Sequence, residues 1–221
     1  SAPAGDLASE DAMSPEVFEA TLQLGRQAVR ELVEGTRLVV LGEMGIGNST
    51  VAAALGAALL ELPEPEAMVG LGTGATPEIL ANKREVVRLA VARLGGERST
   101  REVLRRVGGR ELTALVGAML EASAQRVAVL VDGFIVSAAA LAALRLEPDV
   151  RRALIFSHTS AEAGHQRLLE ACGAKPLLEL GLRLGEGSGA LAAFPLLEAA
   201  VALHRGMATF ESAAVPDRSS P

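Results

Sequence analysis

Aromatic residues and cysteine are scarce in this sequence. Only 2% of the 221 residues are aromatic, all of them Phe, and Trp and Tyr are absent. Proteins that bind nucleic acid by base stacking rely on aromatic side chains, so this class is disfavoured. The single cysteine, Cys172, excludes an intramolecular disulfide and fits a reducing, cytoplasmic location. We expect Cys172 to be a small buried residue near a helix end.

An excess of basic residues is also missing. Lys and Arg number 21 against 27 Asp and Glu, for a net charge of −6, so we expect no nucleic-acid partner. The mean hydropathy is positive, at +0.31. Even so, the longest apolar stretches, such as residues 133–144, fall short of the roughly 18 residues that a membrane-spanning helix needs. We interpret them as buried core helices, and residues 1–14 lack the apolar segment of a secretory signal.

The apolar share is 49%, which is enough for a sizeable core. Because aromatic residues are scarce, this core must be built mainly from Leu, Val, Ile and Ala. This composition suits buried parallel strands covered by Ala-rich helices. Short β-branched runs predict strands at 37–42, 126–131 and 153–156, each followed by a helical pattern. The alternation predicts an α/β fold with a mainly parallel sheet, whose carboxyl-end loops converge into one crevice.

The chain reads as one domain with irregular ends. Residues 1–13 are expected to form an irregular arm, 14–210 the α/β domain and 211–221 a weakly ordered tail. The first helix is expected over 15–34, capped by Ser14 and stopped by Gly35. We find neither an internal repeat nor a linker that divides the chain.

A glycine-rich loop, GEMGIGNST at 42–50, lies between a predicted strand and a helix. Gly45 and Gly47 allow a ligand to approach the backbone, and the helix begins at Asn48 or Ser49. Free amides and the positive helix end form an anion site, although a structural tight turn explains the pattern as well. No Lys precedes Ser49, which excludes a Walker A loop, and the glycine spacing differs from the dinucleotide fingerprint.

Two charged residues accompany this loop. Glu43 would be repelled by a phosphate, so it should face something else, either ribose hydroxyls or solvent. Lys83 follows a second glycine-rich loop at 70–75 and is within reach of a phosphate as a point charge. From spacing alone, a solvated lysine on a helix face is the simpler interpretation of Lys83.

A second constellation is GEGSG at 185–189. Glycines on both sides of Glu186 leave room for a flat substrate to lie against its carboxylate. A carboxylate buried in such a niche is suited to general-base catalysis. The alternative is a glutamate at a helix start, favoured there by the helix dipole.

The segment SHTSAEAGH at 157–165 contains His158, Glu162 and His165. Glu162 and His165 have the spacing of helical metal ligands, but a convincing further ligand is missing, so we expect no metal. Helix capping by Ser160 and supporting polar roles are the preferred interpretation. A serine-hydrolase elbow is likewise missing.

Taken together, five ordered blocks resemble one family. GEMGIGNST, VGGRE (107–111), VDGFIVSAAAL (131–141), SHTSAEAGH and LRLGEGSGALAAFPLLEAA (182–200) are similar to the nicotinate-nucleotide–dimethylbenzimidazole phosphoribosyltransferases. The resemblance spans about residues 14–210. It implies a Rossmann-like three-layer fold with accessory helices, a homodimer, and a reaction without a cofactor or metal clamp. In that reaction nicotinate mononucleotide gives its phosphoribosyl group to 5,6-dimethylbenzimidazole, yielding α-ribazole 5′-phosphate and nicotinate in cobalamin biosynthesis.

Site residues follow from the resemblance position by position. Glu186 matches the family's catalytic glutamate, Lys83 and the 45–49 loop match positions associated with the nucleotide phosphate, and Glu43 and Ser160 match pocket residues. The expected substrate-binding set is Glu43, Met44, Gly45, Ile46, Gly47, Asn48, Ser49, Lys83, Ser160 and Gly185.

There are departures from the family pattern. Ser49 replaces a common Thr, Arg110 stands where an aromatic or aliphatic residue is common, and the 70–77 loop differs. Family members usually carry a further N-terminal segment that shapes the benzimidazole pocket, and we expect this sequence to begin beyond it. One alternative is therefore a non-catalytic nucleotide-phosphate-binding or dimerisation fragment. Another is a nucleotide glycosidase, in which water replaces the aromatic base.

Overall fold

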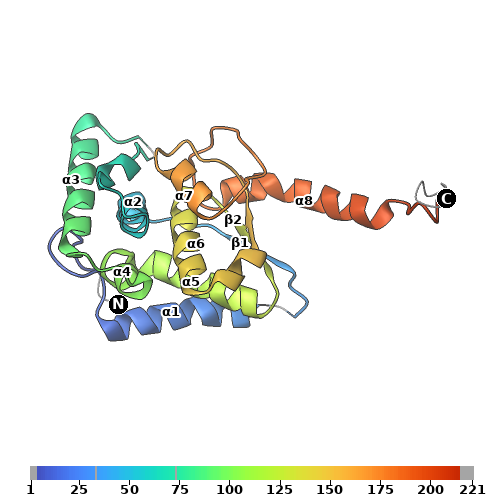
Figure 1. Ribbon diagram of the computed structural model, residues 1–221, viewed down its shortest axis with the longest axis horizontal. Coiled ribbons are helices and arrows are strands. Elements are labelled where there is room, and N and C mark those ends of the chain that lie inside the picture. Colours follow the sequence, from blue (N-terminus) through green and yellow to red (C-terminus); the bar gives the residue numbers. More distant parts are fainter. Residues whose placement is uncertain (1–3, 33, 73, 215–221) are drawn as a thin grey trace, which may run out of the picture.

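The sheet lies at the centre of the molecule. The computed structural model describes residues 4–32, 34–72 and 74–214 (Figure 1). Strands β1 (Leu38–Leu41), β2 (Ala128–Val131) and β3 (Leu154–Phe156) form a parallel sheet in the order β1-β2-β3. Each strand is slightly shorter than its predicted run. The predicted parallel α/β fold is confirmed.

Helices occupy the connections between the strands and the segments at both ends. The described helices are α1 (Pro15–Arg30), α2 (Asn48–Leu59), α3 (Pro77–Arg93), α4 (Thr100–Val107), α5 (Gly109–Ala124), α6 (Phe134–Leu146), α7 (His165–Ala171) and α8 (Ser188–Gly206), with 3-10 turns η1 (Pro65–Met68) and η2 (Pro148–Arg152). Ser14 caps α1 as predicted, its Oγ accepting from the N–H of Val17 at 3.3 Å. The helix ends at Arg30, before the predicted residue 34, because its buried stripe stops at Val29 and Leu32 is exposed.

Small residues allow the helices of the core to pack closely. Helices α2 and α6 are rich in Ala and almost wholly buried, which confirms that the apolar stretch 133–144 is a core helix. Where α1 crosses α5, a Cβ on Gly25 or on Gly117 would overlap the backbone of the opposite helix. Cys172 is buried after α7 as predicted, and burial raises the pKa of its thiol to about 12.

A buried carboxylate joins α1 to α5. Arg30 donates from Nε to Glu121 Oε1 at 2.8 Å and from Nη2 to Oε2 at 2.9 Å. Arg26 adds an ion pair with the same carboxylate at 3.6 Å. The hydrogen bond from Arg30 is the main cause that lowers the pKa of Glu121 to about 2, although burial opposes it. Glu121 is therefore ionised throughout the physiological range.

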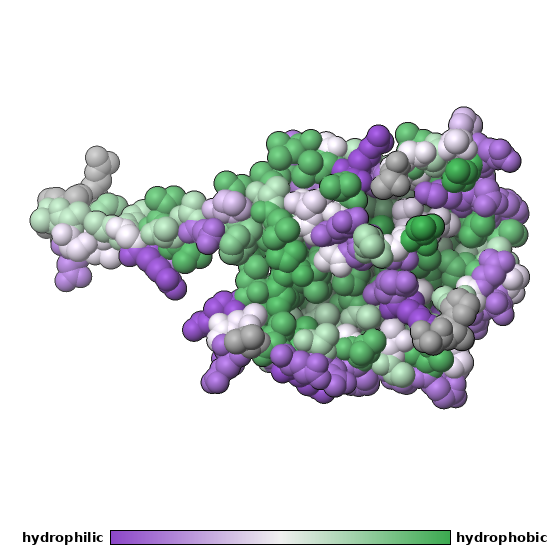
Figure 2. Space-filling view, turned by 180° about the vertical axis from the view of Figure 1, so that it is seen from behind, coloured by the Kyte–Doolittle hydropathy of each residue, from purple (hydrophilic) through white to green (hydrophobic). Residues whose placement is uncertain are grey.

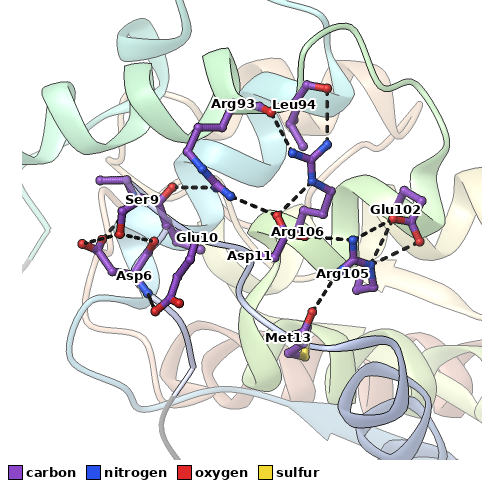
Figure 3. A network of polar contacts seen from close by, with 12 residues as sticks. Asp6, Ser9, Glu10, Asp11, Met13, Arg93, Leu94, Glu102, Arg105 and Arg106 are labelled. Carbon is purple, nitrogen blue, oxygen red and sulfur yellow. Dashed lines mark hydrogen bonds and ion pairs between the residues drawn. The ribbon is translucent and has the colours of Figure 1, made fainter.

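The segment before α1 is fixed to the helices by one aspartate (Figure 3). Asp11 accepts hydrogen bonds from Arg93 and Arg106 on Oδ1, both at 3.0 Å, and from Arg105 on Oδ2 at 2.9 Å. Residues 4–13 form turns without a helix or strand, yet their apolar side chains Leu7, Ala12 and Met13 are buried. The expected arm thus packs on the junction between α3 and α4.

Helix α8 projects from the body and carries the chain toward its C-terminal end (Figure 1). Apolar surface extends along the projecting helix and over the adjoining face of the body (Figure 2). Its exposed apolar residues and those just beyond it include Leu191, Leu196, Val201, Leu203, Met207 and Phe210. Residues 211–214 of the predicted tail form a turn, and the rest of that tail lies outside the described residues. Within the described ranges, no helix combines the length and apolarity needed to cross a membrane.

Candidate active site

The loops after the three strands meet at one edge of the sheet. The register places Leu41 beside Val131 and Val131 beside Phe156, so the strands end side by side. Their following loops therefore lie close together, as expected for parallel strands. Together with residues 183–186 they line a cleft of about 450 Å³.

Nearly all predicted site residues line this cleft. They are Glu43, Met44, Gly45, Ile46, Gly47, Ser49, Lys83, Ser160, Gly185 and Glu186. The exception is Asn48, which is buried beneath the loop and donates from Nδ2 to Glu43 Oε2 at 2.6 Å. The sequence blocks that lie far apart in the chain thus come together in one place.

The first glycine-rich loop leads directly into α2. Gly47 has φ +97° at the N-cap position, where no side chain caps the helix, and α2 begins at Asn48 as predicted. Gly45 lies against the amide of Asn48, and a Cβ at this position would overlap it. The positive end of α2 consequently faces the cleft with exposed glycine backbone before it, an arrangement suited to an anion.

Lys83 brings a positive charge to the same end of α2. Lys83 lies on α3, and its Nζ donates to the Oγ of Ser49 in the first turn of α2 at 3.0 Å. Thr76 caps α3, with its Oγ1 accepting from the N–H of Ile79 at 3.3 Å. Lys83 is a lining residue of the cleft, and so the interpretation as a purely solvated lysine is wrong.

Glu43 is the half-buried carboxylate of this loop. Burial raises its pKa above the ordinary value, and the hydrogen bond from Asn48 offsets only part of that effect. The carboxylates of Glu111, Asp132 and Glu186 raise it further. The cleft therefore has an acidic side around Glu43 and a basic side around Lys83.

Glu186 adopts a conformation that is rare for a residue with a side chain. Its φ is +59°, between Gly185 at +85° and Gly187 at +80°. A left-handed backbone costs such a residue roughly 1–2 kcal/mol, so surrounding contacts must maintain it. The side chain is exposed in the cleft, which corrects the expectation of burial: the neighbouring glycines leave it uncovered.

Asp132 is a lining residue that our sequence analysis did not single out. It follows β2 directly and is only 2% exposed. Its Oδ2 accepts from the N–H of Gly187 and its Oδ1 from that of Ala190, both at 3.1 Å. Burial would raise the pKa of Asp132, but nearby His158 and these two N–H groups together lower it. An acidic residue immediately after a parallel strand was the available sequence signal.

The segment 157–165 supports the cleft floor. His165 accepts the N–H of Ser160 on Nδ1 at 2.7 Å, and its Nε2 lies 2.9 Å from Ser137 Oγ. Burial is the main cause that lowers the pKa of His165 to about 4, so it is neutral near pH 7. Since both ring nitrogens have protein partners, neither is open to a metal. No metal-binding group of three or more His, Cys, Asp or Glu occurs among the described residues.

Ser160 does not have the predicted helix-capping role. Helix α7 begins at His165 behind Gly164, so Ser160 does not cap a helix. Its Oγ instead accepts the N–H of Glu162 at 3.3 Å, closing a short turn at the cleft. The capping prediction was wrong because the helix begins only at His165, too far from Ser160 for its side chain to cap it. The alanine and glycine residues between them give no sequence signal for this start.

Chemically, the cleft pairs an anion site with an exposed carboxylate held on a strained turn. This fold and site define the class of α/β proteins whose ligand cleft lies beyond the carboxyl ends of the parallel strands. The match of a phosphoribosyltransferase family model to residues 1–215 makes the class specific: this chain belongs to that phosphoribosyltransferase family.

Relatives of known name agree with the family. The chain is 51% identical over 209 residues to a nicotinate-nucleotide–dimethylbenzimidazole phosphoribosyltransferase of Pseudomonas aeruginosa PAO1, covering 94% of this chain and 59% of the relative. A Bradyrhizobium relative of the same name is 49% identical over 218 residues, covering 97% and 62%. The crystal structure of CobT from Thermus thermophilus has a TM-score of 0.90 at 48% identity, covering 96% and 64%. The chain thus spans about three fifths of the length of these relatives.

Proposed function

We propose that this chain transfers the phosphoribosyl group of nicotinate mononucleotide to 5,6-dimethylbenzimidazole, yielding α-ribazole 5′-phosphate and nicotinate for cobalamin biosynthesis. The observation that carries the proposal is that Glu186, the glycine-rich loop before α2 and Lys83 line the same cleft. The names of the relatives give the substrates. A domain over residues 14–210 would contain the whole site.

In the proposed complex the 5′-phosphate lies at the start of α2. The positive helix end and exposed glycine amides attract it, and Lys83 adds a full charge beside Ser49. Glu43 would repel the phosphate and is assigned to the ribose hydroxyls, which donate hydrogen bonds to a carboxylate. Ser160 also lines the cleft.

The reaction needs a base at the other end of the ribose. One ring nitrogen of dimethylbenzimidazole attacks C1′ while the C1′–N bond to nicotinate breaks, inverting C1′ from β to α. Nicotinate leaves with the electron pair, which neutralises its pyridinium ring. The other benzimidazole nitrogen loses its proton to Glu186. General-base catalysis of this kind contributes typically 10²–10⁴-fold, and holding the two reactants in line contributes much of the rest.

The test is nicotinate release, measured by chromatography with and without dimethylbenzimidazole. We expect nicotinate release that depends on added dimethylbenzimidazole, with α-ribazole 5′-phosphate formed in equal amount. Glu186→Gln should lower the rate about 10²–10⁴-fold while binding of nicotinate mononucleotide is nearly retained. The Pseudomonas relative provides the positive control.

Each alternative predicts a different result in the same assay. Release without added base would identify a glycosidase. Nucleotide binding without any release, under conditions in which the relative is active, would identify a non-catalytic nucleotide-binding fragment. A fully active Glu186→Gln variant would remove the general-base assignment while leaving the transfer reaction in place.

A homodimer and a cytoplasmic location belong to the same proposal. Leu191, Leu203 and Phe210 expose apolar side chains on or just beyond the projecting helix, and surfaces of this kind are commonly covered by a second subunit. The buried free thiol of Cys172 is compatible with a reducing compartment. Light scattering after size-exclusion chromatography tests the dimer, and a monomeric mass would contradict it.

A further inference from the structure

Asp132 has no assigned part in the proposed chemistry, although both of its oxygens are used. It lies beyond the central strand β2 and is 2% exposed. Its carboxylate accepts the N–H of Gly187 on one oxygen and that of Ala190 on the other, both at 3.1 Å. These two donors stand on either side of the helix start that follows Glu186. Asp132 therefore connects the centre of the sheet to the turn that carries the proposed base.

This contact replaces a cap that α8 lacks in its own sequence. The N-cap residue is Gly187, which has no side chain to accept a hydrogen bond. The N–H groups in the first turn of a helix have no partner within the helix, and a carboxylate there is also favoured by the dipole. Asp132 supplies this acceptor from a different part of the chain, and the start of α8 depends on it.

The turn needs such a contact because its backbone is strained. Residues 185–187 all have positive φ, Glu186 among them at +59°. On one side of Glu186 the peptide is held by its own N–H, which donates to the carbonyl oxygen of Glu43 at 3.2 Å. On the other side it is held by the bond from Gly187 to Asp132. Loss of either contact releases one end of the strained residue.

His158 in turn holds Asp132. Its Nε2 lies 3.6 Å from Asp132 Oδ1, and both side chains are almost fully buried. The imidazole ring packs against Gly189 so closely that a Cβ on Gly189 would overlap it. Gly133 lies on the same ring, with 3.3 Å between His158 Nε2 and a Cβ built on that glycine. These contacts hold the imidazole ring beside the Asp132 carboxylate.

We propose that Asp132 is a positioning residue for Glu186: its buried carboxylate, oriented by His158, fixes the 185–190 turn so that Glu186 is presented to the cleft. The inference rests on the proposed function, in which Glu186 is the base. Asp132 does not touch the reacting atoms in this arrangement and acts through the backbone of Gly187 and Ala190.

The test is a double-mutant cycle with Asp132→Asn and Glu186→Gln. The amide keeps the shape of the carboxylate but offers one acceptor oxygen and turns an NH₂ group toward one of two N–H donors. We expect the single change Asp132→Asn to lower kcat for nicotinate release about 10²-fold, as small displacements of a catalytic group do, with KM for nicotinate mononucleotide within about threefold of the unaltered chain. In the Glu186→Gln background the same change should lower kcat by less than about twofold. If the two changes lower kcat independently, so that their fold losses multiply in the double variant, the inference is overturned.

Hydrogen exchange gives a readout that does not depend on activity. The peptide containing residues 185–190 should exchange faster in Asp132→Asn, with exchange in α1 unchanged. Unchanged exchange in the turn would contradict the inference. Ser14→Ala is the matched control, because it removes a helix cap outside the cleft: it should lower the melting temperature and leave kcat unchanged.

The two proposals fail in different ways. If the unaltered chain releases no nicotinate, the proposed function fails, and the exchange measurement alone decides whether Asp132 holds the turn. If Asp132→Asn does not fold, His158→Gln takes its place, since it leaves both N–H contacts intact and only loosens the carboxylate. His158→Gln should lower kcat about tenfold and speed hydrogen exchange in the turn. Unchanged kcat and unchanged exchange would contradict the inference.

Discussion

The backbone N–H of Glu186 donates a hydrogen bond to the carbonyl oxygen of Glu43, with 3.2 Å between nitrogen and oxygen. This bond joins the turn before α8 to the loop after β1. It also keeps the two carboxylates near each other, and Glu186 is one of the charges that raise the pKa of Glu43. The acidic side of the cleft is thus held together by backbone contacts despite the repulsion between its charges.

Glu43→Gln should stabilise the fold and weaken nucleotide binding. Burial raises the pKa of Glu43 above the ordinary 4.5, so the folded state is penalised once the pH exceeds that value. Because solvent screens a half-buried charge, we expect the free energy of unfolding to increase by no more than about 1 kcal/mol at pH 7.5. The gain should vanish below pH 4.5, where Glu43 is protonated in both states.

Urea unfolding at several pH values, with calorimetry of nicotinate mononucleotide binding, measures both effects. Glu198→Gln, an exposed change on α8, is the control and should alter neither quantity. A stabilised variant with undiminished nucleotide affinity would show that Glu43 does not contact the ribose.

Glu121→Gln should weaken the contact between α1 and α5. Its side chain is 9% exposed and accepts two hydrogen bonds from Arg30, so the change should cost about 1–3 kcal/mol at pH 7. Because its pKa is lowered from 4.5 to about 2, the contribution of Glu121 is complete above pH 4.5 and is lost as the pH falls through about 2. The variant should therefore approach the unaltered chain in stability at the acidic end.

Chemical denaturation at pH 7 and pH 3 checks this. Glu85→Gln is matched to it, since Glu85 pairs with Arg88 at 2.7 Å but is 53% exposed, and it should leave the stability nearly unchanged because solvent screens the pair. Equal losses in the two variants would mean that burial of the pair contributes nothing.

Asp11→Asn should loosen the segment before α1. Asp11 is partly exposed, and although burial opposes the effect, hydrogen bonds from Arg106, Arg105 and Arg93 lower its pKa. The amide removes the charge and keeps only one acceptor oxygen, so the guanidinium groups can no longer all be satisfied, at a cost of about 1 kcal/mol. Limited proteolysis should then cut residues 4–13 faster. Asp149→Asn, in an exposed pair with Arg152, should leave the cutting rate unchanged.

Gly189→Ala should damage the cleft through His158. Gly189 does not need a positive φ, but its added Cβ would run into the imidazole ring. The ring must move away from Asp132, so we expect a loss of about 1–3 kcal/mol in stability and a fall in nicotinate release. Gly206→Ala is the control, because a Cβ there meets open space and Ala favours the helix by about 0.5–1 kcal/mol. Thermal melts of both variants would show opposite shifts.

Local patterns were enough to predict the scaffold and most of the lining residues. β-branched runs identified the strands, and the helices that follow Ser14 and the first glycine-rich loop start where expected, because capping and strand formation depend on neighbouring residues. The order of strands along a parallel sheet then brings the following loops to one edge, so the positions of Glu43 and Glu186 in one cleft could be anticipated.

Contacts between distant segments could not be anticipated in this way. Nothing near Asp132 in the chain shows that it caps a helix beginning at residue 188, and nothing near Lys83 shows that it reaches Ser49. The exposure of Glu186 was predicted wrongly because glycine neighbours indicate space without saying what fills it.

By itself, the sequence determined the secondary structure and the chemical types gathered at the carboxyl ends of the strands, because both follow from local backbone preferences and from parallel strand order. Only the tertiary structure decided how these groups are held. The left-handed turn at Glu186, its anchor on Asp132 and the shared acceptor Asp11 all rest on side chains that meet across the folded chain. Such contacts form when packing excludes water and leaves buried donors and acceptors in need of partners.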